Sequence, residues 1–241
     1  MRSGRDLWRV AGKTLFGLVV FMAVLWGYAF ASQQWALRTP LPEGAPRSGR
    51  CSIWFIGSST IHKWTNMREI MSPWDARNRG VNGATLDEID TRYRLDDRTA
   101  GTPAAVVFYI GENDIADGMT GSEAAQGVRV LVMHQRTKMP NTPAFVLGMK
   151  PSPTRWRFRA QQQAFDRTIQ PMIAKMSGVR FVAAGDTLLI DGQPGAFYQD
   201  DGIHLNDAGY RRWGGFIRRE LESAPTLRYL RDCQPSGGHS S

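Results

Sequence analysis

Short apolar segments alternate with longer stretches of helical periodicity through residues 51–222. The apolar segments are rich in β-branched and aromatic residues, which is typical of buried strands. The pattern predicts strands at residues 52–56, 76–79, 104–110, 144–149 and 179–183, and helices at residues 60–71, 86–93, 122–138, 155–176 and 207–221. Because strands that alternate with helices favour a parallel sheet covered on both faces, we expect an α/β fold. Its architecture would be a flavodoxin-like, three-layer, doubly wound parallel sheet of five strands.

A continuous apolar segment, rather than a periodic one, lies near the N-terminus. Residues 14–37 carry no charged side chain, and residues 15–31 are almost wholly apolar. About 17 to 25 such residues suffice to cross the hydrocarbon core, so residues 14–31 are expected to form one transmembrane helix before the sheet domain. Residues 1–13 carry four basic side chains and one acidic side chain, which predicts that they stay in the cytoplasm.

A cleaved secretory signal is the alternative for this segment. Ala29-Phe30-Ala31 has the small-x-small form of a cleavage site, although the apolar stretch exceeds the about 7 to 15 residues usual in signals. Both interpretations export the remainder of the chain. The uncleaved helix predicts a single-pass protein of the inner (plasma) membrane, with its folded domain on the periplasmic, extracytoplasmic side.

The remaining boundaries follow from composition. Residues 32–50 are rich in proline and glycine without a hydrophobic period, which predicts a partly extended linker. Residues 51–222 contain all the expected strands and helices and form the candidate folded domain. Residues 223–241 are expected to form a C-terminal extension that ends in a flexible polar tail.

Composition and charge narrow the class of protein. The 241 residues include 30 Lys and Arg against 22 Asp and Glu, and 42% are hydrophobic, which excludes disordered and collagen-like classes. Of the net charge of +8, +3 belongs to residues 1–13, where it serves as a topology signal. The basic balance is therefore poor support for nucleic-acid binding, and we expect none.

The chain has two cysteines, Cys51 and Cys233, at the two ends of the folded region. Export to an oxidising compartment would favour a disulfide between them, and two buried free thiols are the alternative. Neither lies in a Cys-x-x-Cys motif, so no zinc site is expected.

Polar and glycine residues follow the expected strands. The segments are Gly57-Ser58-Ser59-Thr60, Gly80-Val81-Asn82-Gly83, Gly111-Glu112-Asn113-Asp114 and, beyond the last strand, Asp201-Gly202-Ile203-His204. Because the carboxyl ends of parallel strands meet at one edge of the sheet, these segments should cluster there. A serine, backbone donors, an amide and a carboxylate–imidazole pair together suit acyl transfer.

Ser59 is the candidate nucleophile because it stands at a strand-to-helix junction, where unpaired N–H groups stabilise negative charge. Helix capping is the alternative role for this serine. His204 is the candidate base, since Asp201 lies three residues before it and can orient its imidazole. Asp200 is the alternative orienting residue. His62 is a rival base, although a helix would carry it along the chain rather than across the site.

A tetrahedral intermediate needs hydrogen-bond donors directed at its oxyanion. The backbone N–H groups of Ser59 and Gly83 and the side-chain amide of Asn113 could supply three. Taken singly, Gly83 and Asn113 are each more typical of an ordinary turn.

Taken together, these segments resemble the SGNH/GDSL hydrolase superfamily. Its first, second, third and fifth blocks are similar to FIGSS at 55–59, NRGVNGAT at 78–85, GEND at 111–114 and DGIHLN at 201–206. The resemblance implies that Ser59 is the nucleophile of a triad with Asp201 and His204. It implies that Gly83 and Asn113 complete the oxyanion hole, and that neither a metal ion nor an organic cofactor is required.

Two positions depart from the family pattern. Ser58 replaces its name-giving aspartate, as in a Gly-Ser-Ser subset, and Ala84 stands where many members have aspartate. The stretch KPSPTRW at 150–156 also resembles that subset. It is expected to form one wall of the pocket, with a proline-rich loop and a helix start as the alternative.

The resemblance implies a serine esterase or acylhydrolase that cleaves a carboxylic ester. With an outward-facing anchor, we expect an ester-bearing small molecule, glycan or lipid as substrate, carrying a short acyl group. One alternative is a glycan O-acyltransferase that uses the same triad, and another is a catalytically silent binding domain. A metal-dependent phosphatase that uses Asp114, Asp200, Asp201 and His204 is a third.

Overall fold

The structure, a computed structural model, describes residues 4–42, 49–96 and 101–233 and divides into two compact units, residues 1–39 and 40–241. The first unit is a single helix, α1 (Gly4–Leu37). Large apolar side chains along it are exposed, among them Phe16, Met22 and Trp26. Within the residues whose side chains are described, no helix is both long enough and apolar enough to qualify as a membrane span.

Helix α1 runs six residues beyond the predicted end at Ala31, into the segment expected to be a partly extended linker. Residues 32–37 contain neither proline nor glycine, so the helix has no reason to stop before the first breaker, Pro40. Residues 32–37 of the segment predicted as a partly extended linker are therefore helical. Residues 43–48 of that linker lie outside the described residues.

The second unit is built on a parallel sheet. Its strands are β1 (Gly49–Gly57), β2 (Asp75–Gly80), β3 (Pro103–Tyr109), β4 (Ala144–Leu147) and β5 (Val179–Val182). They are paired in the order β2-β1-β3-β4-β5, and every pairing is parallel. This order confirms the predicted five-stranded, flavodoxin-like α/β fold.

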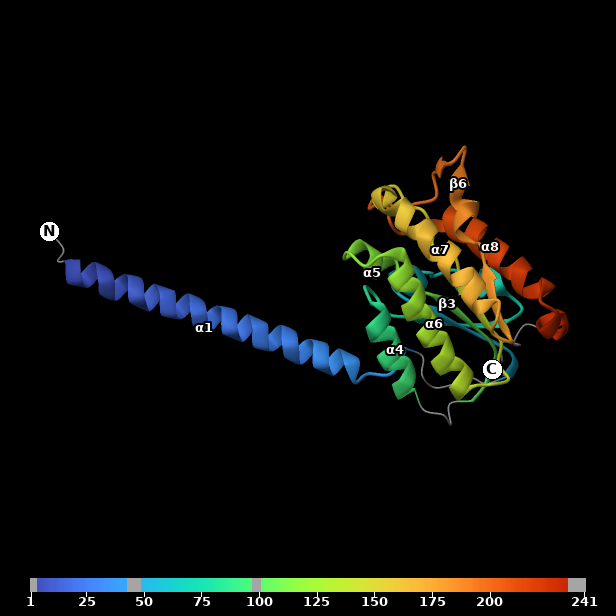
Figure 1. Cartoon of the computed structure of the whole chain (residues 1–241), viewed down its shortest axis with the longest axis horizontal. Helices are drawn as coiled ribbons and strands as arrows, with labels where there is room; N and C mark the ends of the chain where they lie inside the picture. Colours follow the sequence, from blue (N-terminus) through green and yellow to red (C-terminus); the bar gives the residue numbers. More distant parts are fainter. Residues whose placement is uncertain (1–3, 43–48, 97–100, 234–241) are drawn as a thin grey trace, which may run out of the picture. The chain divides into compact units, whose positions relative to one another are not determined.

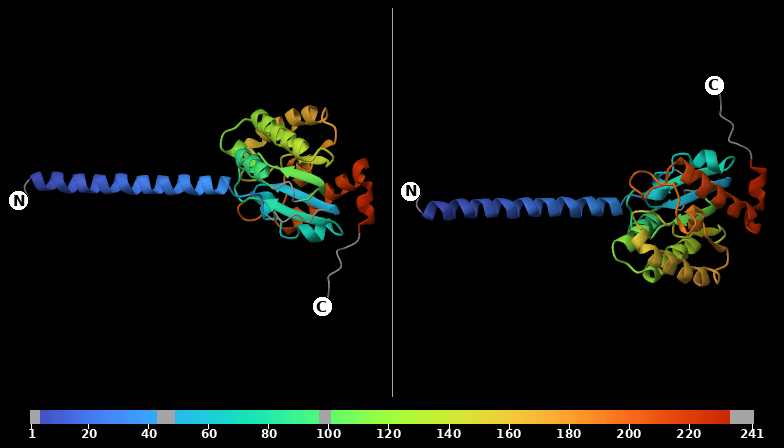
Figure 2. Two further views of the ribbon diagram at one scale, coloured as in Figure 1. Left: turned by 90° about the horizontal axis from the view of Figure 1, so that it is seen from below. Right: turned by 90° about the horizontal axis from the view of Figure 1, so that it is seen from above.

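Helices cover both faces of the sheet (Figures 1 and 2). One face packs against α4 (Leu86–Leu95), α6 (Gly121–Lys138) and α7 (Arg159–Ile173), and the other against α2 (Ser59–His62), α3 (Met67–Met71), α8 (Asp207–Ser223) and the 3-10 helix η4 (Pro225–Asp232). Alternate residues of β1 enter opposite cores: Ile53 and Phe55 join one, and Trp54 and Ile56 join the other. Both faces of this strand are therefore buried, as its continuous apolar run predicts.

The helix predicted at residues 60–71 is in fact two short helices, α2 and α3. The break lets Trp64 leave the helical path and pack against Phe55, Tyr210 and Trp213 in the core. A tertiary contact therefore decides the break, and local propensity alone does not predict it.

The helix predicted at residues 155–176 is shorter, because the 3-10 turn η2 (Trp156–Phe158) precedes α7. Several short elements were not predicted: α5 (Glu112–Ala116), η3 (Gly185–Leu188), and the hairpin of β6 (Leu189–Ile190) and β7 (Gln193–Pro194). In that hairpin Asp191 and Gly192 both have positive φ, 50° and 77°. An Asp-Gly pair of this kind is a strong signal for a two-residue hairpin turn.

Cys51 of β1 and Cys233, which follows η4, form a disulfide across 182 residues of chain. This outcome confirms the disulfide and excludes the alternative of two free thiols. Cys233 is buried in the same core as Leu227 and Leu230 of η4. The bond therefore ties the C-terminal segment to the central part of the sheet.

Removing the disulfide should destabilise the second unit. Cys51→Ser combined with Cys233→Ser should lower the free energy of unfolding by about 2–5 kcal/mol, because the unfolded chain gains the freedom of a long open loop. Urea unfolding under oxidising conditions measures this change. Wild-type protein treated with a reductant is the control and should match the double variant, whereas an unchanged unfolding midpoint in both would contradict the prediction.

Candidate active site

Ser59 lies at the carboxyl edge of the sheet, where the backbone of several elements approaches closely. β1 ends at Gly57, and α2 begins at Ser59. A Cβ atom at Gly57 would lie 2.1 Å from the carbonyl oxygen of Tyr109 at the end of β3, and one at Gly80 would lie 2.2 Å from the backbone nitrogen of His62. Only glycine permits both approaches, so the turn that carries Ser59 is pressed against the ends of β2 and β3.

The structure brings Ser59, His204 and Asp201 together. Ser59 Oγ lies 2.9 Å from His204 Nε2, although the two residues are 145 positions apart. His204 Nδ1 lies 2.5 Å from Asp201 Oδ2. An Nδ1–H that donates to Asp201 leaves the lone pair of Nε2 available to accept the hydroxyl proton of Ser59.

The local turn holds the Asp201 carboxylate in place. Its Oδ1 also accepts the backbone N–H groups of Ile203 and His204, at 2.8 and 2.9 Å. Desolvation acts to raise the pKa of Asp201, but the hydrogen bonds from His204 and Ile203 outweigh it and hold that pKa well below its usual range. The carboxylate therefore stays ionised and available to the imidazole.

Lys63 is a second neighbour of the imidazole, with Nζ 3.1 Å from His204 Nδ1. An ammonium group can only donate, and the shorter contact to Asp201 uses the hydrogen on Nδ1. Lys63 therefore adds a positive charge beside the ring rather than a further hydrogen bond to Nδ1.

The rival residues lie elsewhere. Asp200 is exposed, and no described residue forms a hydrogen bond with its side chain. His62 is also exposed, and its Nδ1 lies 3.3 Å from the carbonyl oxygen of Gly80 rather than near Ser59. The geometry therefore favours His204 and Asp201 over both alternatives.

The two loops that carry the other candidate donors are bound to each other. Asn113 Nδ2 donates to the carbonyl oxygen of Ala84 at 3.0 Å. The carboxylate of Asp114 accepts the N–H of Leu86, the first residue of α4, at 3.0 and 3.2 Å. The N–H of Gly83, which has φ +73°, forms no hydrogen bond with any described residue. These contacts keep the Gly83 and Asn113 donors on neighbouring loops.

Among the described residues, no group of three or more His, Cys, Asp or Glu side chains could hold a metal ion. The rival phosphatase interpretation required Asp114 as a ligand. Its carboxylate instead accepts the N–H of Leu86, and burial raises its pKa.

A buried charged cluster that the sequence did not predict lies beside Asn113. Glu112, 3% exposed, accepts from Lys150 Nζ at 3.0 Å and from the hydroxyl of Tyr109 at 2.9 Å, and Arg155 Nη1 lies 3.3 Å from it. Burial acts to raise the pKa of Glu112, but the charges of Lys150 and Arg155 outweigh it and lower that pKa. Glu112 is therefore ionised inside the protein. Its one sequence signal is a charged residue shortly after an apolar strand.

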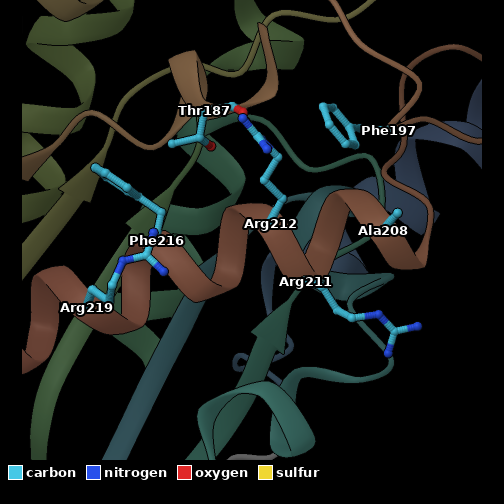
Figure 3. A pocket seen from close by; sticks show the side chains of 7 residues that line it. All are labelled: Thr187, Phe197, Ala208, Arg211, Arg212, Phe216 and Arg219. Atoms are coloured by element: carbon cyan, nitrogen blue, oxygen red, sulfur yellow. The ribbon is translucent and has the colours of Figure 1, made fainter. Parts of the chain in front are cut away.

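A surface hollow of about 680 Å³ lies along α8 (Figure 3). Its lining is aromatic and cationic: Thr187, Phe197, Ala208, Arg211, Arg212, Phe216 and Arg219. The guanidinium of Arg212 stacks over the ring of Phe197, and that of Arg219 over Phe216. None of the residues near Ser59 lines this hollow, so it is separate from the candidate active site.

A serine, an imidazole and a carboxylate in contact at the carboxyl edge of this sheet define the class of α/β serine ester hydrolases. The sequence comparison agrees. Residues 56–212, more than half of the chain, match the model of the GDSL-like Lipase/Acylhydrolase family. The chain belongs to this family.

Three similar proteins share about a fifth to a quarter of their aligned residues with this chain. The chain is 24% identical over 169 residues to human platelet-activating factor acetylhydrolase IB subunit alpha2, covering 66% of this chain and 71% of the relative. A solved structure from Streptococcus pneumonia named for platelet activating factor superposes with a TM-score of 0.68 at 19% identity, covering 84% and 98% of the two chains. A Clostridium thermocellum family 3 carbohydrate esterase gives a TM-score of 0.60 at 20% identity, covering 76% and 98%. At these identities the solved structures support the fold alone.

Asp166 of α7 supports the loop that begins at Met149, since its Oδ1 accepts the N–H of Met149 at 3.0 Å. Burial raises the pKa of Asp166 to about 7, although the nearby Arg159 acts in the opposite direction. The folded protein therefore holds a proton on Asp166 over a pH range in which the unfolded chain has released it.

The pKa of Asp166 is higher in the folded state than in the unfolded chain. The contribution of this group to the free energy of unfolding is therefore fully present below about pH 4 and is lost as pH rises towards 7. Asp166→Asn keeps the acceptor oxygen but cannot ionise. Between pH 5 and pH 8, the free energy of unfolding of Asp166→Asn should therefore fall less than that of the wild type. Urea unfolding at these two pH values measures the difference. Asp200→Asn, an exposed aspartate that does not act on Asp166, is the control and should keep the wild-type pH dependence. An identical pH dependence in wild type and Asp166→Asn would refute the prediction.

Proposed function

We propose that the chain hydrolyses carboxylic esters with Ser59 as nucleophile, His204 as general base and Asp201 as the residue that orients His204. The observation that carries the proposal is the 2.9 Å contact between Ser59 Oγ and His204 Nε2. The oxyanion hole would consist of the N–H groups of Ser59 and Gly83 and of Asn113 Nδ2. The first N–H groups of a helix have no intrahelical partner, which makes the N–H of Ser59 at the start of α2 a suitable donor.

In the first half of the reaction, Ser59 Oγ attacks the ester carbonyl carbon while Nε2 of His204 takes the hydroxyl proton. The negative charge that develops on the carbonyl oxygen is stabilised by the three donors. The tetrahedral intermediate then expels the alcohol, which leaves with the proton held on Nε2. An acyl group remains on Ser59.

In the second half, His204 takes a proton from water, and the resulting hydroxide attacks the acyl carbonyl carbon. A second tetrahedral intermediate collapses, the acid leaves, and Ser59 Oγ recovers its proton from Nε2. Asp201 stabilises the imidazolium in both halves without taking a proton.

We further propose a short acyl group on a glycan or lipid as the substrate class. Two relatives support this choice: one is named as an acetylhydrolase and another as a carbohydrate esterase. Hydrolysis of p-nitrophenyl acetate without any added acceptor tests the reaction itself. Turnover that requires a glycan acceptor would instead favour acyl transfer.

A fluorophosphonate probe tests the nucleophile directly, because it reacts with an activated serine. The wild type should be labelled, and Ser59→Ala should abolish labelling and lower turnover by several orders of magnitude while the protein stays folded. Ser58→Ala is the matched control and should keep both the labelling and the turnover of the wild type. Labelling that survives in Ser59→Ala would contradict the proposal.

The orienting residue can be tested in the same assay by a pair of adjacent substitutions. His204→Ala should reduce turnover about as strongly as Ser59→Ala. Asp201→Asn should reduce it less, because the base remains but the tautomer is no longer set. Asp200→Asn should keep nearly the wild-type turnover. If Asp200→Asn lost most of the turnover and Asp201→Asn kept it, Asp200 would be the residue that orients His204.

We also propose that this hydrolase domain lies outside the cytoplasm and that residues 14–31 anchor it in the inner membrane. The apolar sequence and the preceding basic residues support an exported orientation. The Cys51–Cys233 disulfide supports an oxidising compartment.

An alkaline phosphatase fused to the C-terminus should be active, since that enzyme matures only outside the cytoplasm. The same fusion lacking residues 1–31 is the control and should be inactive. The full-length chain should remain in the membrane fraction after alkaline carbonate extraction. An inactive full-length fusion would contradict the proposed location of the domain outside the cytoplasm. A soluble exported chain that begins at Ser32 would contradict the proposed membrane anchor.

A further inference from the structure

The side chain of Asn113 is held by a donor on one side and an acceptor on the other. Arg155 Nη2 donates to Asn113 Oδ1 at 2.9 Å, and Asn113 Nδ2 donates to the carbonyl oxygen of Ala84 at 3.0 Å. A guanidinium group can only donate and a carbonyl oxygen can only accept. The two partners therefore allow one orientation of the amide, in which the second hydrogen on Nδ2 stays available for an oxyanion.

Arg155 is itself held in place by the buried cluster. Its Nη1 lies 3.3 Å from Glu112 Oε1, and Lys150 Nζ lies 3.0 Å from the same oxygen. The other carboxylate oxygen of Glu112 accepts the hydroxyl of Tyr109. With both oxygens occupied, the carboxylate has little freedom to rotate, and the guanidinium that it binds is fixed as well.

The same cluster contacts the loop that carries the imidazole. Lys150 Nζ donates to the carbonyl oxygen of Ile203 at 2.7 Å, one residue before His204. The hydroxyl of Thr154 donates to the carbonyl oxygen of Asp201 at 2.8 Å. The loop of residues 150–155 thus contacts both the candidate oxyanion donor and the turn of the candidate base.

We propose that Arg155, fixed by the buried Glu112–Lys150 pair, is a positioning residue that holds the Asn113 amide with Nδ2 towards the oxyanion. This inference rests on the proposed function of the site. Arg155 acts through Asn113 and forms no bond with the reacting atoms. A lysine would not replace it, since a single ammonium group lacks the planar fork that reaches Glu112 and Asn113 together.

Arg155→Ala removes the donor to Asn113 Oδ1 and leaves Glu112 still paired with Lys150, so the protein should fold. We expect kcat for p-nitrophenyl acetate to fall about 10- to 100-fold with KM nearly unchanged, less than the 100- to 1000-fold typical for deletion of an oxyanion donor. Added guanidinium ion should restore part of the lost kcat. Arg157→Ala, an exposed arginine two positions along the chain, is the matched control and should keep the wild-type kcat.

A double-mutant cycle with Asn113→Ala separates positioning from a general structural effect. If Arg155 acts through Asn113, the combined variant should match Asn113→Ala alone within about twofold, since no amide remains to orient. Losses that multiply, or a wild-type kcat in Arg155→Ala, would overturn the proposal. If Arg155→Ala does not fold, Arg155→Lys replaces it in the double-mutant cycle with Asn113→Ala. The combined variant should again match Asn113→Ala alone.

Labelling of the wild type by the fluorophosphonate probe distinguishes a failure of the positioning role of Arg155 from a failure of the proposed function. A labelled wild type with an unaffected Arg155→Ala rejects the positioning role alone. An unlabelled, inactive wild type rejects the proposed function and the positioning role with it.

Discussion

The close approach of backbone segments at the carboxyl edge of the sheet is the constraint on which the site depends. Glycine at positions 57 and 80 lets the turn before α2 touch the ends of β2 and β3, where any side chain would collide with main-chain atoms. The position of Ser59 is thus set by rigid main chain. The remaining groups of the site reach this serine from separate loops, and hydrogen bonds between those loops fix their distances.

Those loops are bound together by polar groups rather than by apolar packing. Glu112 and Lys150 are almost fully buried, and burial lowers the pKa of Lys150 while Glu112 acts in the opposite direction. A buried ion pair is weak support for stability, because desolvation offsets much of the Coulomb attraction. Its directional contacts to Arg155 and to the carbonyl oxygen of Ile203 are better explained by the orientation of the site. Apolar side chains could fill the same volume but could not fix an amide or a carbonyl group.

Much of the fold could be predicted because its signals are local. Continuous apolar runs identified β1, β3 and β4, and the alternation of strands with helices identified the parallel arrangement. Two elements depart from the predictions for different reasons. Trp64 breaks a predicted helix because the core accepts its ring, which is a tertiary cause. Helix α1 passes Ala31 because no breaker stands before Pro40, which is a local cause. The disulfide was one of two alternatives, because residue spacing cannot tell whether two sulfurs meet.

The sequence by itself determined the order of strands and helices, the family resemblance and the candidate residues Ser59, Asp201 and His204, since each depends on residue type and neighbours along the chain. Tertiary structure alone decided which aspartate contacts the imidazole, and that Arg155 reaches Asn113 across 42 positions. The sequence favoured Asp201 and left Asp200 as the alternative, and the turn between Gln199 and His204 directs the Asp201 carboxylate to the ring. Hydrogen bonds depend on distances of a few ångströms in space, which a linear pattern does not contain.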